Sequence, residues 1–314
     1  MFKVKIPKIE PFLRDGDSPF KPDKYSRIGL HVPGIIIESS SSFWNLLKMQ
    51  INILHRAIGC LKEMSQSASS IIKNPRKNKK NISENDLLEL KKYIKSLGTN
   101  EIGFTTLDTH MIFINRMILY KNVIVFTMEM KKSKISKAPS GATLREIFRT
   151  YYELCKIANK TADFLRQKGY NAHSGTALGG GASYVPLAAK AGLGEIGKHG
   201  MLISDKEYGP SLRFACVYTD IENLPFNTEN QYEWIKDFCT KCKKCVKTCP
   251  AGAIYENSKT VNGNAETLEC VDYKKCAIPF ANEYGCTRCI KNCSFFNNDY
   301  YKLKKNFEKS INQM

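Results

Sequence analysis

The chain has 314 residues, enough for two domains of ordinary size with a sizeable buried core. Hydrophobic residues make up 42% of it and charged residues 25%, which excludes an intrinsically disordered chain. The 48 Lys and Arg residues exceed the 30 Asp and Glu residues, so the formal net charge is +18. This excess indicates an acidic partner, a cofactor with anionic groups, or a basic surface without a specific partner.

Neither a secretory signal nor a membrane span is expected. The N-terminus has no apolar core after its basic residues and no twin-arginine pair. The most apolar region, residues 111–130, is interrupted by Arg116 and Lys121, whereas a span needs about 20 consecutive apolar residues. We therefore expect no membrane span and a cytoplasmic location, where thiols stay reduced.

Residues 1–98 are expected to be irregular at first and then helical. Prolines punctuate the first forty residues, and the basic segment 73–80 predicts a solvated loop, with a phosphate or nucleic-acid contact as the alternative. Ser83 is a predicted N-cap for a helix that ends before Gly98. A first helix is predicted over residues 43–64 because apolar residues recur there near the helical period: Phe43, Leu46, Leu47, Leu54, Ile58 and Leu61.

Strands and helices alternate in residues 99–225, which predicts an α/β or α+β domain there. Branched and aromatic residues at 122–130 are typical of a buried strand. A capping box at residues 143–146 predicts the start of a long helix that ends at Gly169. The elements expected after it are a short strand at Tyr170, a glycine-rich loop, a helix at 185–191 and a strand at 213–219.

The spacing of the cysteines gives the strongest chemical signal. Most of the 12 cysteines lie between Cys239 and Cys293, and such a local cluster in a large chain argues against a disulfide framework. The run Cys239-x2-Cys242-x2-Cys245-x3-Cys249-Pro is that of bacterial ferredoxins, in which three thiolates bind one [4Fe–4S] cluster and the fourth binds a second cluster. We therefore expect a ferredoxin-like domain over residues 226–300, followed by a tail at 301–314.

A second cysteine group, Cys286-x2-Cys289-x3-Cys293, completes two clusters in a crossed arrangement. Cys270 is a spare thiol that could replace Cys276 as a ligand. Two zinc sites are the alternative, but the spacing and the proline after Cys249 favour iron and sulfur. Cluster one is expected to take Cys239, Cys242, Cys245 and Cys293, and cluster two Cys249, Cys276, Cys286 and Cys289. Buried, unreactive positions are expected for Cys60, Cys155 and Cys216.

The upstream domain resembles a known family of enzymes. Residues 184–204, beginning Tyr-Val-Pro-Leu-Ala-Ala-Lys-Ala-Gly-Leu-Gly-Glu-Ile-Gly-Lys, together with 207–213 and 217–220, resemble the core signature of corrinoid-dependent reductive dehalogenases. The related epoxyqueuosine reductases share the Ala-Gly-Leu-Gly and Ile-Gly-Lys parts of it. The resemblance extends over about residues 120–298, and includes the spacing into the cysteine run.

The resemblance implies a nitroreductase-like domain that binds cobalamin or another corrinoid, with the two clusters reducing its cobalt. It also implies an oxidoreductase that cleaves a small organic substrate reductively, and an electron donor such as a ferredoxin or flavodoxin. Glycines permit close approach of the backbone to a large flat ligand. The residues expected at the corrinoid are Gly180, Gly181, Ser183, Gly192, Leu193, Gly194, Gly197, His199 and Arg213.

Alignment of residues 151–158 with the helix of the dehalogenases places Tyr151 at the family's proton-donating tyrosine. Lys198 falls at the basic residue beside that phenol. Tyr152, one position along, is the alternative donor, and packing at a helix is the alternative role for either ring. His110 stands in an Asp-x-His pattern that lacks the glycine of cobalt-ligating motifs, so it is not expected to ligate cobalt. His173 and His199 lie beside the expected pocket, and both are expected to be ordinary side chains and not cobalt ligands.

Three functions remain open at this stage. The first is a corrinoid iron–sulfur reductase acting on a small molecule. The second is a tRNA-modifying reductase of the epoxyqueuosine type, which the charge favours. Thr150, in place of that group's aspartate, and the lack of helical repeats after Cys293 disfavour it, so nucleic acid is a possible but not a favoured partner. The third is a non-catalytic protein for electron transfer or corrinoid handling.

Overall fold

The computed structural model describes residues 6–29, 39–41, 43–261 and 263–312. At its centre lies an antiparallel sheet in the order β1-β2-β6-β3. In its register Ile102 pairs with Phe126, Asn122 with Thr219, and His173 with Tyr218. The strands are β1 (Ile102–Thr106), β2 (Asn122–Glu129), β6 (Leu212–Thr219) and β3 (His173–Gly175). The combination of this sheet with long helices confirms the predicted α+β class.

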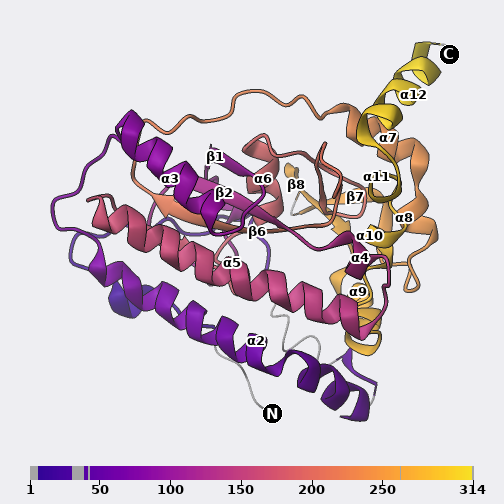
Figure 1. Cartoon of the computed structure of the whole chain (residues 1–314), viewed down its shortest axis with the longest axis horizontal. Helices are drawn as coiled ribbons and strands as arrows, with labels where there is room; N and C mark the ends of the chain where they lie inside the picture. The colour runs from indigo at the N-terminus through magenta and orange to yellow at the C-terminus, as the bar shows by residue number, and fades with distance from the viewer. Residues whose placement is uncertain (1–5, 30–38, 42, 262, 313–314) are drawn as a thin grey trace.

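Helices cover both faces of the sheet, as Figure 1 shows. The long helix α5 (Gly141–Gln167) packs on one face, and the opposite face is covered by α6 (Tyr184–Lys190). Side chains alternate along β6, so that Val217 joins the core under α5 whereas Cys216 joins the core under α6. Because both faces are covered, the interior of β2 is buried throughout.

The helix α2 (Phe43–Ser69) lies along the outer side of α5 and forms a further layer. The predicted helix is confirmed, but the face that it buries differs from the face that the apolar pattern indicates. Cys60 and Met64 are buried against α5, whereas the periodic residues Leu54, Ile58 and Leu61 are exposed. The helix α3 (Glu84–Ser96) begins at the predicted N-cap, where the Ser83 side chain accepts from the Asp86 amide.

The start of α5 differs from the prediction by a few residues. The N-cap is Ser140, whose side chain accepts from the Thr143 amide, so Thr143 is inside the first turn. The predicted capping box is therefore wrong. Glu146 accepts instead from the Lys131 amide and pairs with Arg149 at 2.6 Å, which ties α5 to the end of β2.

Two strands of the central sheet were misplaced or missed in the sequence. The short strand expected at Tyr170 begins only at His173, because the Tyr170 amide still closes the end of α5 by bonding to the Leu165 carbonyl. Strand β1 was not predicted. The remaining elements of this part are η1 (Glu10–Phe12), η2 (Ser70–Lys73), η3 (Thr109–Met111), α4 (Lys132–Ile135), β4 (Glu195–Ile196) and β5 (Leu202–Ile203).

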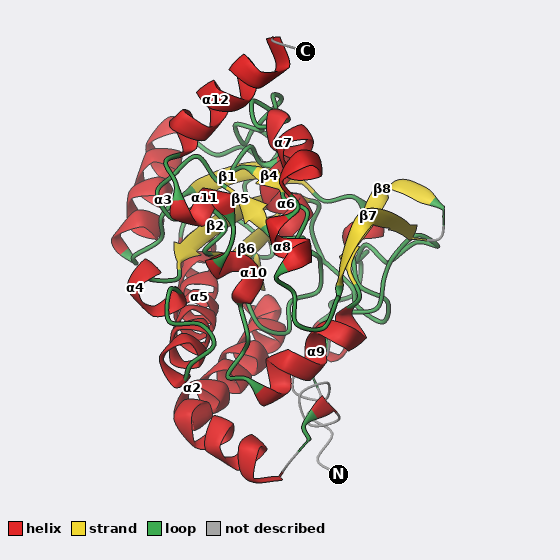
Figure 2. Cartoon of the chain, turned by 90° about the vertical axis from the view of Figure 1, so that its right-hand side faces the viewer, coloured by secondary structure: helices red, strands yellow, loops and turns green. Residues whose placement is uncertain are grey.

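The cysteine-rich part follows the sheet and lies against one side of it, as Figure 2 shows. Its last helix begins at Tyr300, so most of the predicted tail is helical, and Phe307 packs on Trp234 and Phe238. Within the described ranges, each helix is too short or too polar to cross a bilayer. The elements are α7 (Trp234–Cys242), α8 (Lys244–Lys247), β7 (Ile254–Val261), β8 (Asn264–Val271), α9 (Tyr273–Asn282), α10 (Arg288–Lys291), α11 (Ser294–Asn297) and α12 (Tyr300–Asn312).

Close approach of α2 and α5 depends on Gly59, since a Cβ atom there would collide with the Tyr152 ring. We expect Gly59→Ala to lower the free energy of unfolding by about 1–3 kcal/mol through overpacking. In a Tyr152→Ala background the same change should raise that free energy by up to about 1 kcal/mol, because alanine is the better helix former. Urea denaturation followed by far-ultraviolet circular dichroism measures both. An equal loss in the two backgrounds would contradict the contact.

Candidate iron–sulfur site and the adjoining face of the sheet

The four thiols expected at cluster one surround a common cavity. Cys239 and Cys242 lie on α7, Cys245 lies on α8, and Cys293 is the N-cap of α11. All four line the same small cavity, together with Phe238, Phe295 and the loop that carries Lys198 and His199. The thiols from two distant segments of the sequence thus face one enclosed space.

The four thiols expected at cluster two also lie together. Cys249, Cys276 and Cys286 are electrostatic neighbours, and Cys289 is a neighbour of both Cys276 and Cys286. Cys289 is also a neighbour of Cys245 in the first group. The two groups are therefore adjacent, which is the arrangement that electron transfer between two clusters requires.

The two cysteine motifs share one backbone conformation. Lys243, directly after Cys242, has φ of 49°, and Thr287, directly after Cys286, has φ of 58°. Residues other than glycine rarely adopt this left-handed region, and when they do they tend to lie at functional sites. In each motif a one-turn helix, α8 or α10, begins at the next residue. The repeated geometry supports the interpretation of both segments as halves of a ferredoxin-like unit.

Cys270 occupies a different environment from Cys276. It lies on β8, where its Sγ is 3.6 Å from the Ser258 hydroxyl. Cys276 lies on α9 and faces the thiols of Cys249 and Cys286. This placement supports Cys276 as the fourth ligand of cluster two.

Burial keeps three of these thiols protonated in the absence of metal. It raises the pKa of Cys239 and of Cys293 to about 12, and the pKa of Cys276 to about 11. Metal must therefore displace protons on binding. Among the described residues no three Cys, His, Asp or Glu side chains converge as on a single metal ion. The ligands of a [4Fe–4S] cluster need not converge in that way, since the thiolates bind a group of four irons.

Tyr151 and Arg213 meet between α5 and β6. The Arg213 guanidinium lies over the Tyr151 ring, 5.0 Å from its centroid, and Phe148 packs edge-on against the ring. The Arg213 Nε is buried and has no hydrogen-bond partner among the described residues. Tyr152, the alternative donor, is instead packed on Gly59 of α2.

Lys198 lies away from Tyr151. Its Nζ donates to the Glu256 carbonyl on β7, and the residue lines the cavity of the first thiol group. The basic group at the Tyr151 ring in this structure is therefore Arg213, and the expectation that Lys198 holds that phenol has no contact to support it. The reason is the course of the loop after β4, which turns toward the cysteines.

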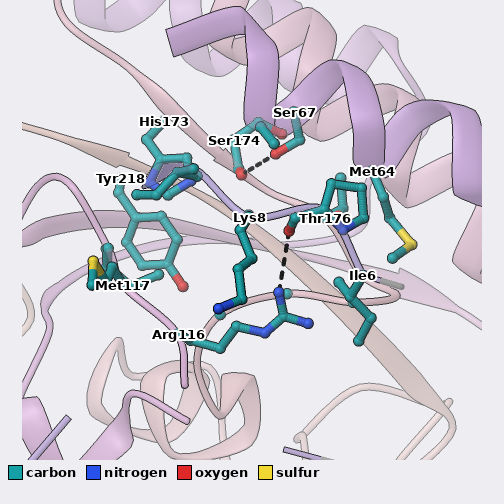
Figure 3. Close-up of a pocket in the computed structure, with 18 of the residues that line it drawn as sticks. Ile6, Lys8, Met64, Ser67, Arg116, Met117, His173, Ser174, Thr176 and Tyr218 are labelled. Carbon is teal, nitrogen blue, oxygen red and sulfur yellow. Dashed lines mark hydrogen bonds between the residues drawn. The ribbon is translucent and has the colours of Figure 1, made fainter. Parts of the chain in front are cut away.

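The glycine-rich loop after β3 packs against protein. Gly180 and Gly181 line a cavity of about 40 Å³, which Figure 3 shows with Lys8 and Arg116 extending across it. A Cβ at Gly180 would overlap the Tyr184 hydroxyl. The small cavity is no corrinoid cradle, because pockets for much smaller ligands have roughly 300–1,000 Å³. Ser183, next in the predicted set, accepts a hydrogen bond from Arg27.

The later residues of the predicted corrinoid set are divided between two places. Gly192 packs on Asn227, and Gly194 packs on the Ile203 carbonyl, with Leu193 between them against Gly103. Gly197 and His199 belong to the loop at the first thiol group. Of the nine residues, Arg213 with its unpaired buried Nε best fits an anionic or amide-bearing cofactor beside Tyr151.

His173 and His110 have ordinary structural places. His173 is buried in β3, where its Nδ1 accepts from the Leu119 amide and burial lowers its pKa to about 3. His110 lies in the short helix η3, and the neighbouring Asp108 pairs with Lys190 at 2.6 Å. Neither arrangement indicates metal ligation.

The comparisons with known proteins agree with this geometry. A family model described as "4Fe-4S binding domain" matches residues 232–255, which contain the first cysteine run. The tetrachloroethene reductive dehalogenase of Desulfitobacterium hafniense is 36% identical over 187 residues, or 56% of this chain and 33% of that protein. The resemblance to reductive dehalogenases is confirmed. The chain spans about a third of the length of these relatives.

Two further comparisons extend the picture. The epoxyqueuosine reductase of Bacillus subtilis is 26% identical over 251 residues, which are 65% of this chain and 62% of that protein. The solved structure of the catabolic reductive dehalogenase NpRdhA covers 96% of this chain and 47% of its own, with 18% identity and a TM-score of 0.66. At this identity the match shows the fold alone, and it confirms the nitroreductase-like and ferredoxin-like architecture predicted from the family.

Sequence reasoning missed some contacts at the cysteines. The Ser294 hydroxyl lies 3.3 Å from the Cys242 Sγ, and the Ala253 amide donates to the Cys249 Sγ at 3.3 Å. Ser294 directly follows Cys293, at the position that proline occupies after Cys249, and this difference was the available signal. Such hydrogen bonds to sulfur influence the reduction potential of a cluster.

The choice between Cys276 and Cys270 can be tested with a matched pair of variants. After anaerobic reconstitution, Cys276→Ser should lose cluster two and retain about four irons per chain, whereas Cys270→Ser should retain about eight. Iron and sulfide analysis with electron paramagnetic resonance (EPR) measures both. Loss of iron from Cys270→Ser alone would reverse the assignment.

Proposed function

We propose that this protein is an iron–sulfur reductase of the reductive dehalogenase type. The observation that carries the proposal is the pair of adjacent thiol groups beside a sheet of the dehalogenase fold. In this proposal Cys239, Cys242, Cys245 and Cys293 hold cluster one, and Cys249, Cys276, Cys286 and Cys289 hold cluster two. The relatives on both sides of the family, the dehalogenases and the epoxyqueuosine reductases, are oxidoreductases.

We further propose a corrinoid as the electron acceptor, held at the face where Arg213 and Tyr151 meet. One solved dehalogenase structure similar to this chain is described as suggesting a mechanism for B12-dependent dehalogenation. A bound corrinoid supplies a cobalt centre that can be reduced strongly enough to cleave a carbon–halogen bond. The buried, unpaired Arg213 Nε is the donor this chain offers to such a group.

Tyr151 is the proposed proton donor of the reaction. Reductive cleavage of a carbon–halogen bond replaces the halide with a proton and two electrons, so a side chain must supply the proton. The half-buried phenol lies on the middle of α5, and its ring is fixed between Phe148 and the Arg213 guanidinium. These contacts orient the hydroxyl while excluding water from one side of the ring.

The substrate class, the electron donor and the location are parts of the same proposal. Small halogenated molecules are favoured as substrates, because several relatives are named for tetrachloroethene and one solved dehalogenase is in complex with 3-bromo-4-hydroxybenzoic acid. A ferredoxin or flavodoxin in the cytoplasm would deliver electrons singly to the clusters.

A tRNA-modifying reductase is the second candidate function. The net charge of +18 and the match to epoxyqueuosine reductases favour it. The position of their aspartate is occupied by Thr150, which is buried and whose hydroxyl donates to the carbonyls of Glu146 and Ile147 within α5. Because this hydroxyl is committed to its own helix, it offers no substitute for a carboxylic acid, and the dehalogenase-like function is favoured.

Reconstitution tests the cofactors directly. The anaerobic chain would be treated with iron, sulfide and hydroxocobalamin and then desalted, and its iron and cobalt content measured together with its absorption spectrum. We expect about eight irons and one cobalt per chain. Eight irons without retained cobalt would support the clusters and refute the corrinoid, leaving a non-catalytic electron-transfer protein as the better interpretation.

Turnover tests the proton donor. With a reduced viologen as donor and 3-bromo-4-hydroxybenzoic acid or tetrachloroethene as the probe, Tyr151→Phe should lower kcat by about 10²–10⁴-fold, the usual contribution of a general acid. Tyr152→Phe is the matched control and should change kcat little, since its ring packs on α2. The reverse result would identify Tyr152 as the donor. Wild-type rates in both variants would show that neither tyrosine donates the proton.

A further inference from the structure

The loop between β4 and β5 brings the sheet domain onto the cysteine cavity. β4 and β5 pair antiparallel, with Glu195 opposite Ile203. Their connection is tight, because the Gly197 amide donates to the Met201 carbonyl at 2.9 Å and the Gly200 amide donates to the Gly197 carbonyl at 2.8 Å. The tip of this loop is therefore held in one conformation.

His199 lies at the tip of this loop and is almost wholly buried, with 2% of its surface exposed. Its Nδ1 accepts from the Met201 amide at 3.1 Å. Since Nδ1 accepts, a neutral ring carries its proton on Nε2.

The Nε2–H of His199 is a buried donor without an acceptor among the described residues. Buried donors left without a partner cost free energy, and native structures contain few of them. His199 lines the same cavity as Cys239, Cys242 and Cys293. The backbone amide of the preceding residue, Lys198, interacts with the Cys239 thiol and offsets part of the effect of burial on its pKa.

We propose that the Nε2–H of His199 donates a hydrogen bond to a sulfur atom of cluster one. The inference rests on the proposed assignment of that cluster to the cavity. It places His199 at the iron–sulfur site, whereas the sequence predicted His199 to lie at the corrinoid. His199 acts here as a positioning and tuning residue for the cluster.

The bond has a definite electrostatic consequence. Reduction adds one negative charge to a [4Fe–4S] cluster, and a donor to sulfur stabilises the more negative state more strongly. The donor therefore raises the reduction potential of cluster one. Cluster two, whose expected thiols do not line the cavity that contains His199, should be affected much less.

The test is a redox titration monitored by EPR on the full chain reconstituted with iron and sulfide alone. We expect His199→Leu to shift the equilibrium of cluster one toward the oxidised form by about tenfold, which is about 59 mV for one electron. His199→Gln is the matched variant, because its amide can present a donor at the position of Nε2. It should restore most of the potential, and cluster two serves as an internal reference.

A second readout covers the case in which the variants assemble poorly. In the wild-type chain, electron–nuclear double resonance on reduced cluster one should show an exchangeable proton coupling that is absent from a chain without His199. An unchanged potential in both variants would overturn the proposal. So would strong nitrogen coupling from direct ligation, or loss of four irons in both variants.

This outcome is separable from that of the proposed function. A chain with eight irons and the expected shift, but no reductive turnover, would retain the role of His199 and refute the reductase. A wild-type chain that never binds eight irons would refute the two-cluster assignment, and the hydrogen bond with it.

Discussion

The convergence of eight thiols in two adjacent groups is the constraint on which the rest of this structure depends. Burial raises the pKa of Cys239, Cys276 and Cys293, so these thiols stay protonated and neutral without metal. Metal binding releases protons, and the free energy of binding contributes to folding. The convergence of the thiols also explains the left-handed conformation of Lys243 and Thr287, because in each motif a one-turn helix begins directly after that residue.

A buried carboxylate is one of the contacts that join the sheet domain to this cysteine-rich part. Glu195 accepts from the Asn230 side chain at 2.7 Å and pairs with Lys236 of α7 at 3.2 Å, although only 3% of its surface is exposed. Three residues later the β4–β5 loop reaches the cavity of the first thiol group. The signature segment therefore helps to fix the sheet against the first cysteine helix.

The sequence allowed accurate prediction where the signal is local. The cap at Ser83 and the strand at 122–130 depend on neighbouring residues, and both were found. The cap of α5 was misplaced because Ser140 and Thr143 compete for the same role, and only the packing of Glu146 against Lys131 and Arg149 distinguishes them. Strand β1 was missed because its alternation is weak and its partner lies about twenty residues away.

The same difference between local and distant signals explains which parts of the candidate site could be predicted. Cysteine spacing reflects a short-range backbone geometry, so the two thiol groups could be assigned, and the remaining question between Cys270 and Cys276 concerns a hairpin inserted between the motifs. The roles of the glycines could not be assigned in this way, because a glycine indicates only that another group packs closely against the backbone. At Gly180 the approaching group is Tyr184, at Gly194 it is the Ile203 carbonyl, and at Gly197 the neighbours are Ile203 and His199. A signature shared with reductive dehalogenases therefore encodes, in this chain, close packing within its own sheet domain and part of the contact with the cysteine cavity.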